Sequence, residues 1–125
     1  MNAEQKNFIE VVGAIASADM KNSGVAASLT TAQAILESAW GKSELTKTGN
    51  ALFGIKATKD WKGKTLTRKT TEYEGGKKVQ VEAEFRAYDT WEDSVKDHSA
   101  FLKKYKRYAK VIGETDYKEA CKAVA

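Results

Sequence analysis

The chain contains one cysteine, one histidine and no proline among its 125 residues. Because Cys121 has no second cysteine to pair with, an internal disulfide is excluded. No stretch approaches the ~18–20 continuous apolar residues of a membrane span, so we expect no membrane partner. The His, Cys, Asp and Glu residues show no metal-ligand spacing, and no glycine-rich phosphate loop is present, so we predict neither a metal nor a cofactor.

The composition is typical of one folded domain. Apolar residues make up 42% of the chain and recur with regular periodicity, which argues against disorder. No internal repeat, low-complexity tract or linker divides the sequence, so we treat residues 1–125 as a single domain. The 21 basic and 17 acidic residues give a net charge of +4, which would suit an anionic partner but equally keeps a small domain soluble.

Apolar residues at helical spacing predict four helices, and a β-hairpin is predicted between two of them, so the expected fold is a mainly α-helical α+β fold. The first helix runs from about residue 3 to 18, the second ends at Gly41, and residues 46–64 are mostly loop. The predicted N-caps of the four helices are Asn2, Ser28 or Thr30, Asp89 or Thr90, and Thr115 or Asp116.

The second helix carries a carboxylate at the border of its apolar stripe. Glu37 lies one turn from Gln33 and close to Trp40, where apolar and indole surface would disfavour its charged form and raise its pKa. A carboxyl group that keeps its proton near neutral pH can act as a general acid, although most such glutamates are simply solvated helix residues. The residues expected to face the core beside it are Leu29, Ala32, Ile35, Leu36 and Ala39.

Residues 64–86 are predicted to form a β-hairpin. Gly75-Gly76 supplies a two-residue turn, which fixes the register so that Glu72 faces Val79 and Leu66 faces Phe85. Glu72 then shares the inward face with the apolar residues of the second strand. A buried carboxylate without a partner is costly, so Glu72 should find a partner or line a cleft, unless it overhangs the core near the hairpin tip and meets only water.

Two glutamates, one on a helix and one on a hairpin that overhangs it, suit the hydrolysis of a glycosidic bond. One carboxylic acid protonates the leaving oxygen while the other activates water or attacks the sugar, and their separation decides which. A hairpin can also serve as a mobile wall that closes over bound substrate. The sequence does not give the distance between the two carboxyl groups. Retention, inversion and a substrate-assisted route, in which the N-acetyl group of the substrate attacks, therefore all stay open.

Several segments resemble those of one known family and occur in the same order. They are the run 32–43, the loop 49–57, Phe85-Arg86-Ala87-Tyr88, the helix from Ser94 to Leu102, and Arg107-Tyr108. Together they resemble the endo-β-N-acetylglucosaminidase domains of glycoside hydrolase family 73, which include flagellar and autolysin peptidoglycan hydrolases and phage lysins. The resemblance implies a lysozyme-like fold in which the hairpin forms one wall of the cleft. It also implies cleavage of the β-1,4 bond after N-acetylglucosamine in the glycan strand of bacterial peptidoglycan.

The resemblance also implies roles for individual residues. The family's general acid falls on Glu37, and its hairpin glutamate, a base or electrostatic stabiliser, falls on Glu72. The aromatic residues of its cleft match Phe53 and two tyrosines, and we add an asparagine and a tryptophan as candidates from the residues themselves. Each candidate has an ordinary structural alternative in packing or in forming the backbone. The candidate substrate contacts are Phe53, Tyr88, Tyr108, Asn50 and Trp40.

The resemblance also bears on partners and location. Family members usually continue past the last helix with a further segment, whereas this chain stops at Ala125, so we expect the last wall of the cleft to be missing or removed. Residues 1–6 lead straight into a helix without a visible signal peptide, so a wall hydrolase of this sequence would have lost a leader or be phage-encoded. The expected partner is bacterial peptidoglycan, with no nucleic acid, and the expected state is a monomer.

Two other functions stay open at this point. Muramidase-type cleavage of the alternate glycan bond is one, because the lysozyme-like fold serves both specificities. The other is a non-catalytic basic module that holds glycan or nucleic acid through lysine clusters interleaved with tyrosines. His98, the only histidine, and Cys121 are both better explained as core residues than as catalytic groups.

Overall fold

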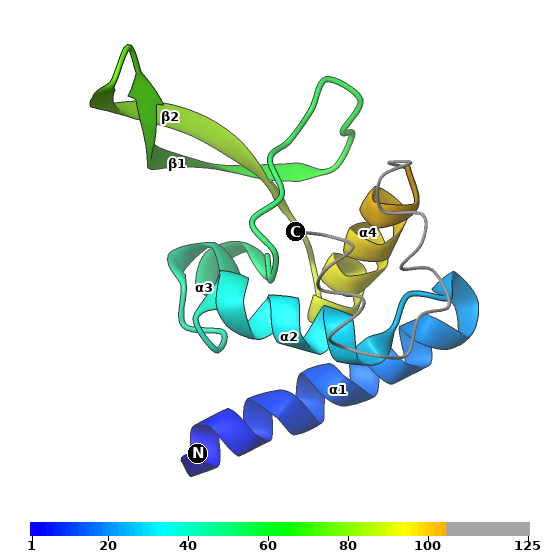
Figure 1. The fold of residues 1–125 in the computed structure, drawn as a ribbon. Helices are drawn as coiled ribbons and strands as arrows, with labels where there is room; N and C mark the ends of the chain where they lie inside the picture. The colour runs from blue at the N-terminus through cyan, green and yellow to red at the C-terminus, as the bar shows by residue number, and fades with distance from the viewer. Residues whose placement is uncertain (105–125) are drawn as a thin grey trace.

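The structure is a computed structural model that describes residues 1–104. Its elements in chain order are α1 (Ala3–Ser23), α2 (Ala27–Ser38), α3 (Glu44–Gly49), β1 (Lys64–Glu74), β2 (Lys77–Ala87) and α4 (Trp91–Lys104). The helices pack together, and the two strands form an antiparallel hairpin that projects from them (Figure 1). The predicted mainly helical α+β fold with a hairpin is therefore confirmed. The predicted fourth helix, Tyr108 and Cys121 lie outside the described residues.

Helix α1 begins as the sequence predicts but ends later. The Asn2 side chain accepts a hydrogen bond from the Gln5 backbone N–H at 2.8 Å, and the Gln5 side chain accepts one from the Asn2 N–H at 3.1 Å. The predicted end near residue 18 is wrong, because the helix continues for more than a turn to Gly24, whose φ of 77° is left-handed. The added turn is held by a tertiary contact, in which the Ser99 hydroxyl of α4 donates to the Asp19 carboxylate at 2.6 Å.

The hydrophobic core lies where α1 packs against α2 and α4. Its buried centre consists of Phe8, Val12, Ala34, Leu52, Phe53 and Val95. Leu52 and Phe53 come from the segment that follows α3, so this segment passes through the core instead of over the surface. Within residues 1–104, no helix has the length and apolarity needed to cross a lipid bilayer.

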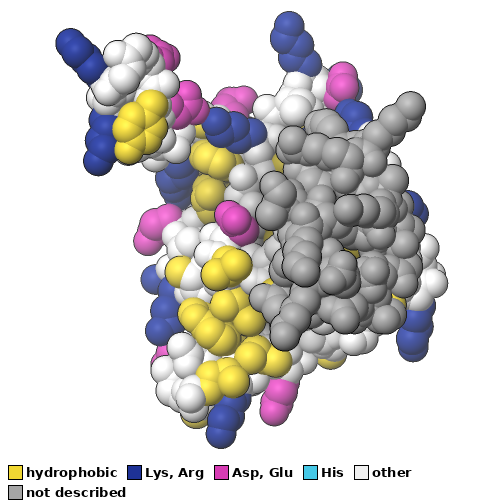
Figure 2. Space-filling view, in the orientation of Figure 1, with side chains coloured by type: hydrophobic (Ala, Val, Ile, Leu, Met, Phe, Trp, Pro, Cys, Tyr) yellow, Lys and Arg dark blue, Asp and Glu magenta, His cyan; other side chains and the backbone are white. Residues whose placement is uncertain are grey.

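The buried face of α2 differs from the predicted stripe. Leu36, expected in the core, is 78% exposed. Leu29 is buried as predicted, and the other buried residues of the helix are Thr30, Ala34 and Ser38, which were not predicted. The buried Ser38 hydroxyl is satisfied, because it donates to the Ala34 carbonyl at 2.5 Å and accepts from the Gly41 N–H at 2.8 Å. Figure 2 shows the consequence, since hydrophobic side chains lie exposed over α2 and upward toward the hairpin.

Both ends of α2 also differ from the prediction. The helix begins after Ala26 without a side-chain cap, so neither Ser28 nor Thr30 caps it, and the Thr30 hydroxyl donates to the Ala26 carbonyl instead. It stops earlier than predicted, because Ala39 and Trp40 have left-handed φ angles of 50° and 60°. Left-handed backbone is unfavourable for residues other than glycine, so tertiary packing must hold this turn.

A short helix, α3, lies partly within the segment predicted to be loop. Its N-cap is Ser43, whose hydroxyl accepts from the Thr46 N–H at 3.2 Å, and it ends at Asn50, which is left-handed with a φ of 52°. Farther along, Thr90 is one of the two caps predicted for α4, and its hydroxyl accepts from the Asp93 N–H at 3.1 Å. Local hydrogen bonds from small polar residues therefore set both helix starts.

The hairpin has the register that the two-residue turn predicts. Glu72 pairs with Val79, and Leu66 pairs with Phe85. The segment 55–57 runs beside the base of β2, where the Ile55 carbonyl accepts from the Arg86 N–H at 2.9 Å and the Ala57 N–H donates to the Glu84 backbone carbonyl at 2.8 Å. The base of the hairpin is thereby fixed to the same segment that crosses the core.

Candidate active site

Glu37 lies in the last turn of α2 and is exposed to solvent. It borders a cavity of about 170 Å³, whose lining includes Gln33, Glu37, Phe53, Ile55, His98 and Leu102. These residues come from α2, α4 and the segment that follows α3, so three parts of the chain build the cavity. The structure therefore brings Glu37 and Phe53, two predicted site residues, to one cavity.

Trp40 packs against the first helix. Its ring lies edge-to-face on Phe8, with centroids 6.1 Å apart, and Phe8 contacts Trp91 in the same way at 5.5 Å. A Cβ added at Gly41 would meet the Phe8 ring at 3.0 Å, so the turn fits closely over this aromatic cluster. These contacts give Trp40 the packing role that the sequence left open, and they hold the left-handed turn that follows Glu37.

Glu72 forms an ion pair with Lys56. The Lys56 Nζ lies 2.9 Å from the Glu72 Oε1, and the Glu72 side chain is 40% exposed. The prediction that an inward-facing carboxylate would find a partner is confirmed. The carboxylate remains accessible to a ligand because its burial is only partial.

The same ion pair shows that the hairpin curves. Lys56 pairs with Phe85 at the base of the hairpin, opposite Leu66. Glu72 lies six residues farther along β1, which is about 20 Å in a straight strand and too far for the two side chains to bridge. The ribbon must bend back toward the segment 55–57, and Figure 1 shows a curved ribbon. Ile55, the neighbour of Lys56 in the chain, lines the Glu37 cavity, whereas Lys56 and Glu72 themselves do not.

His98 is buried and lines the cavity. Its ring stacks on Phe53 with centroids 3.8 Å apart, and its Nε2 lies 2.7 Å from the Gln33 Oε1. Burial lowers the pKa of His98 to about 3, so the ring is neutral near pH 7. Since the Gln33 oxygen can only accept, the His98 Nε2–H is the donor. The prediction that His98 is a core residue is confirmed, because the residue is 5% exposed.

This histidine predicts a pH-dependent stability. Because its pKa is about 3 in the folded chain and 6.5 ordinarily, the unfolded chain binds the proton more readily between these values. We expect the free energy of unfolding to fall by about 2 kcal/mol from pH 7 to pH 5, as urea unfolding would measure. The His98→Phe variant keeps a ring beside Phe53 and should lose most of this dependence. An unchanged dependence in that variant would assign the effect to other groups.

Tyr88 and Asn50 join the hairpin to α3 and α4. The Tyr88 hydroxyl donates to the Asp97 carboxylate at 2.5 Å, and its backbone N–H donates to the Gly49 carbonyl at 2.8 Å. The Asn50 amide donates to the carbonyls of Tyr88 and Asp89, at 3.1 Å each. Burial, followed by the Asp97 hydrogen bond, raises the pKa of Tyr88 above its usual range, so the hydroxyl stays protonated. In the described part of the chain, neither residue lines the Glu37 cavity.

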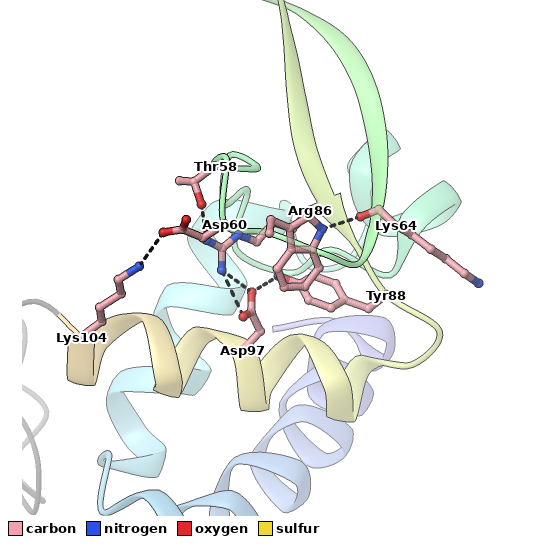
Figure 3. Close-up of polar contacts among 8 residues, drawn as sticks. Thr58, Asp60, Lys64, Arg86, Tyr88, Asp97 and Lys104 are labelled. Carbon is pink, nitrogen blue, oxygen red and sulfur yellow. Dashed lines mark hydrogen bonds and ion pairs between the residues drawn. The ribbon is translucent and has the colours of Figure 1, made fainter.

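A buried ion pair at the base of the hairpin was not predicted from the sequence. The Arg86 Nη1 lies 3.1 Å from both carboxylate oxygens of Asp97, and Figure 3 shows the two side chains meeting above α4. Their side chains are only 10% and 16% exposed. The Arg86 guanidinium also lies 4.7 Å from the centre of the Trp61 ring. No periodic pattern pairs a strand residue with a helix residue, so the sequence carried no clear signal for this contact.

Comparison with known proteins points to one family. The sequence profile described as mannosyl-glycoprotein endo-beta-N-acetylglucosaminidase matches residues 13–125. The exo-glucosaminidase LytG of Bacillus subtilis is 39% identical over 126 residues, covering 97% of this chain and 44% of the relative. A probable N-acetylmuramidase of Lactococcus lactis is 40% identical over 97 residues, covering 77% of this chain and 22% of the relative. The chain thus spans less than half the length of these curated relatives.

Comparison with solved structures points to the same family. The crystal structure of the catalytic domain of the autolysin Auto from Listeria monocytogenes superposes with a TM-score of 0.88 and 31% identity. The match covers 100% of this chain and 75% of that domain. The lysozyme-like fold expected from the sequence is therefore confirmed.

Proposed function

Because the chain belongs to the glucosaminidase family, glycoside hydrolase family 73, we propose that it hydrolyses the β-1,4 bond after N-acetylglucosamine in bacterial peptidoglycan. The observation that carries the proposal is a pair of accessible acidic side chains, with Glu37 beside a cavity and Glu72 on the hairpin. Most glycoside hydrolases use two carboxyl groups that flank the scissile bond. On this proposal the protein acts at the bacterial cell wall.

In the proposed mechanism, Glu37 donates a proton to the glycosidic oxygen. Its exposed position at the edge of the cavity is compatible with contact to that oxygen. Glu72 acts as the base or as the electrostatic stabiliser of the positively charged transition state. In its ion pair with Lys56 it is a carboxylate, which is the form that both roles require. Movement of the curved hairpin would bring this carboxylate over bound substrate.

For the other predicted site residues we propose different roles. We propose Phe53 as a substrate contact, because it lines the cavity beside Glu37. The contacts of Trp40, Asn50 and Tyr88 support a positioning role, in which they hold the turn after Glu37 and the base of the hairpin. Tyr108, outside the described residues, stays a predicted substrate contact.

A second candidate is muramidase-type cleavage, which the probable N-acetylmuramidase among the relatives favours. Both candidates can be tested by digesting purified cell walls, reducing the released fragments with borohydride and weighing them by mass spectrometry. Reduced N-acetylglucosamine at the new end supports the proposed bond. Reduced N-acetylmuramic acid supports the second candidate, and intact walls after binding contradict both and favour a non-catalytic module.

The Glu72→Gln variant should clear walls about a hundredfold more slowly than the unaltered chain. Glutamine keeps the size of the side chain but cannot act as a base or supply negative charge, and a general base contributes roughly 10²–10⁴-fold. The Glu84→Gln variant is a matched control, since Glu84 is exposed on the same hairpin. Equal rates for the two variants would make Glu72 a surface residue without a role in the reaction.

A further inference from the structure

The cavity beside Glu37 is too small for a disaccharide. Its volume is about 170 Å³, whereas pockets that bury a drug-sized ligand have roughly 300–1,000 Å³. One substituent of a sugar therefore fits it better than the sugar chain. Its lining combines the apolar side chains of Phe53, Ile55 and Leu102 with the amide of Gln33. An acetamido group has the matching combination, a methyl group next to a carbonyl oxygen.

The Gln33 amide is held in one orientation. Its Oε1 accepts a hydrogen bond from the His98 Nε2–H at 2.7 Å. The His98 ring cannot turn freely, because it is buried and stacked on Phe53 at 3.8 Å. With the oxygen facing His98, the amide nitrogen faces the other way and keeps two N–H donors. Within residues 1–104 this nitrogen donates no hydrogen bond.

We propose that Gln33 contacts the substrate, donating from its amide nitrogen to the carbonyl oxygen of an N-acetyl group seated in the cavity beside Glu37. The methyl group of the acetyl then lies against Phe53 and its apolar neighbours. His98 is a positioning residue, since its Nε2–H is already donated to Gln33 and it acts by holding that amide. The identity of the substrate rests on the proposed function, whereas the binding preference does not require turnover.

The test is binding of two trisaccharides, N-acetylated chitotriose and its de-N-acetylated form, measured by calorimetry in a Glu37→Gln background that suppresses cleavage. Adding Gln33→Met should weaken binding of the acetylated sugar about tenfold, which is the size of one hydrogen bond. Binding of the de-N-acetylated sugar should change less than about twofold. The preference is the ratio of the affinities for the acetylated and the de-N-acetylated sugar. Because Gln33→Met changes no charge, the free amines of the second sugar affect this ratio equally with and without the substitution.

Three further variants sharpen the test. Gln80→Met makes the same change at an exposed hairpin position and should leave the preference unaltered. His98→Phe should lower the preference for the acetylated sugar by a smaller factor, because Gln33 is then present but free to turn. If Gln33→Met fails to fold, Gln33→Ala replaces it, since alanine also removes the N–H donors and likewise leaves the charge unchanged.

An undiminished preference in Gln33→Met, or equal losses for both sugars, would overturn the proposal. Wall digestion by the unaltered chain separates this outcome from failure of the proposed function. Cleaved walls with an undiminished preference would refute the role of Gln33 alone. Uncleaved walls with a preference that depends on Gln33 would refute the hydrolase and leave Gln33 as an acetyl-binding residue.

Discussion

Replacing Glu37 with glutamine is expected to abolish the clearing of purified bacterial walls while the fold stays intact. Glutamine has the size of glutamate, but its amide cannot supply the proton that the leaving oxygen needs. Loss of a general acid costs roughly 10²–10⁴-fold, so residual clearing should be at least about a hundredfold slower. The loss of turbidity of a wall suspension measures the rate, and circular dichroism measures the fold.

The matched control for this variant is Glu44→Gln. Glu44 is also an exposed helical glutamate, at the start of the next helix, and it does not line the cavity. We expect this control to clear walls at the rate of the unaltered chain. Near-normal clearing by Glu37→Gln would show that Glu37 is not the general acid. Loss of helical circular dichroism would make the variant uninformative and require Glu37→Ala in its place, which also removes the proton donor.

The second large effect concerns stability, in the Asp97→Asn variant. This change removes the negative charge that faces Arg86 and leaves a guanidinium that is 10% exposed without its counter-charge. Breaking one side of a buried ion pair costs about 3–5 kcal/mol, so the free energy of unfolding should fall by about 3 kcal/mol or more. Urea unfolding followed by tryptophan fluorescence would measure the loss.

The same change at an exposed ion pair gives the control. Asp89 pairs with Lys64, and their side chains are 68% and 71% exposed, so Asp89→Asn should alter stability by no more than about 1 kcal/mol. The double variant Arg86→Met, Asp97→Leu should recover much of the lost stability, because neither charge is then buried alone. Equal effects of Asp97→Asn and Asp89→Asn would mean that burial contributes nothing to the pair.

The hairpin shows how much the sequence determines by itself. The Gly75-Gly76 turn and the alternation of apolar residues were sufficient to predict the register of the strands and the face on which Glu72 lies. The N-cap at Asn2 was predicted in the same way, and its side chain accepts from the Gln5 N–H. In both cases the interacting residues are close in sequence, or are brought opposite one another by a single short turn, so local chemistry is sufficient.

Helix α2 marks the limit of such reasoning. The sequence predicted a helix that carries Glu37, but it assigned Leu36 to the core, where the structure has Ala34 and Ser38 instead. Hydrophobicity favours the larger side chain, whereas the volume available between packed helices selects the small ones. The early end of the helix has a similar cause, because the packing of Trp40 on Phe8 holds a turn that local propensity disfavours.

The sequence by itself determined which two carboxylates are candidates for the reaction, because helix and hairpin periodicity place them. Only the tertiary structure decided what surrounds them. Gln33 and His98 are 65 residues apart, Lys56 and Glu72 are 16 apart, and Arg86 and Asp97 are 11 apart in different elements. Such contacts depend on where whole elements come to rest against the core, and no pattern within one element specifies that position.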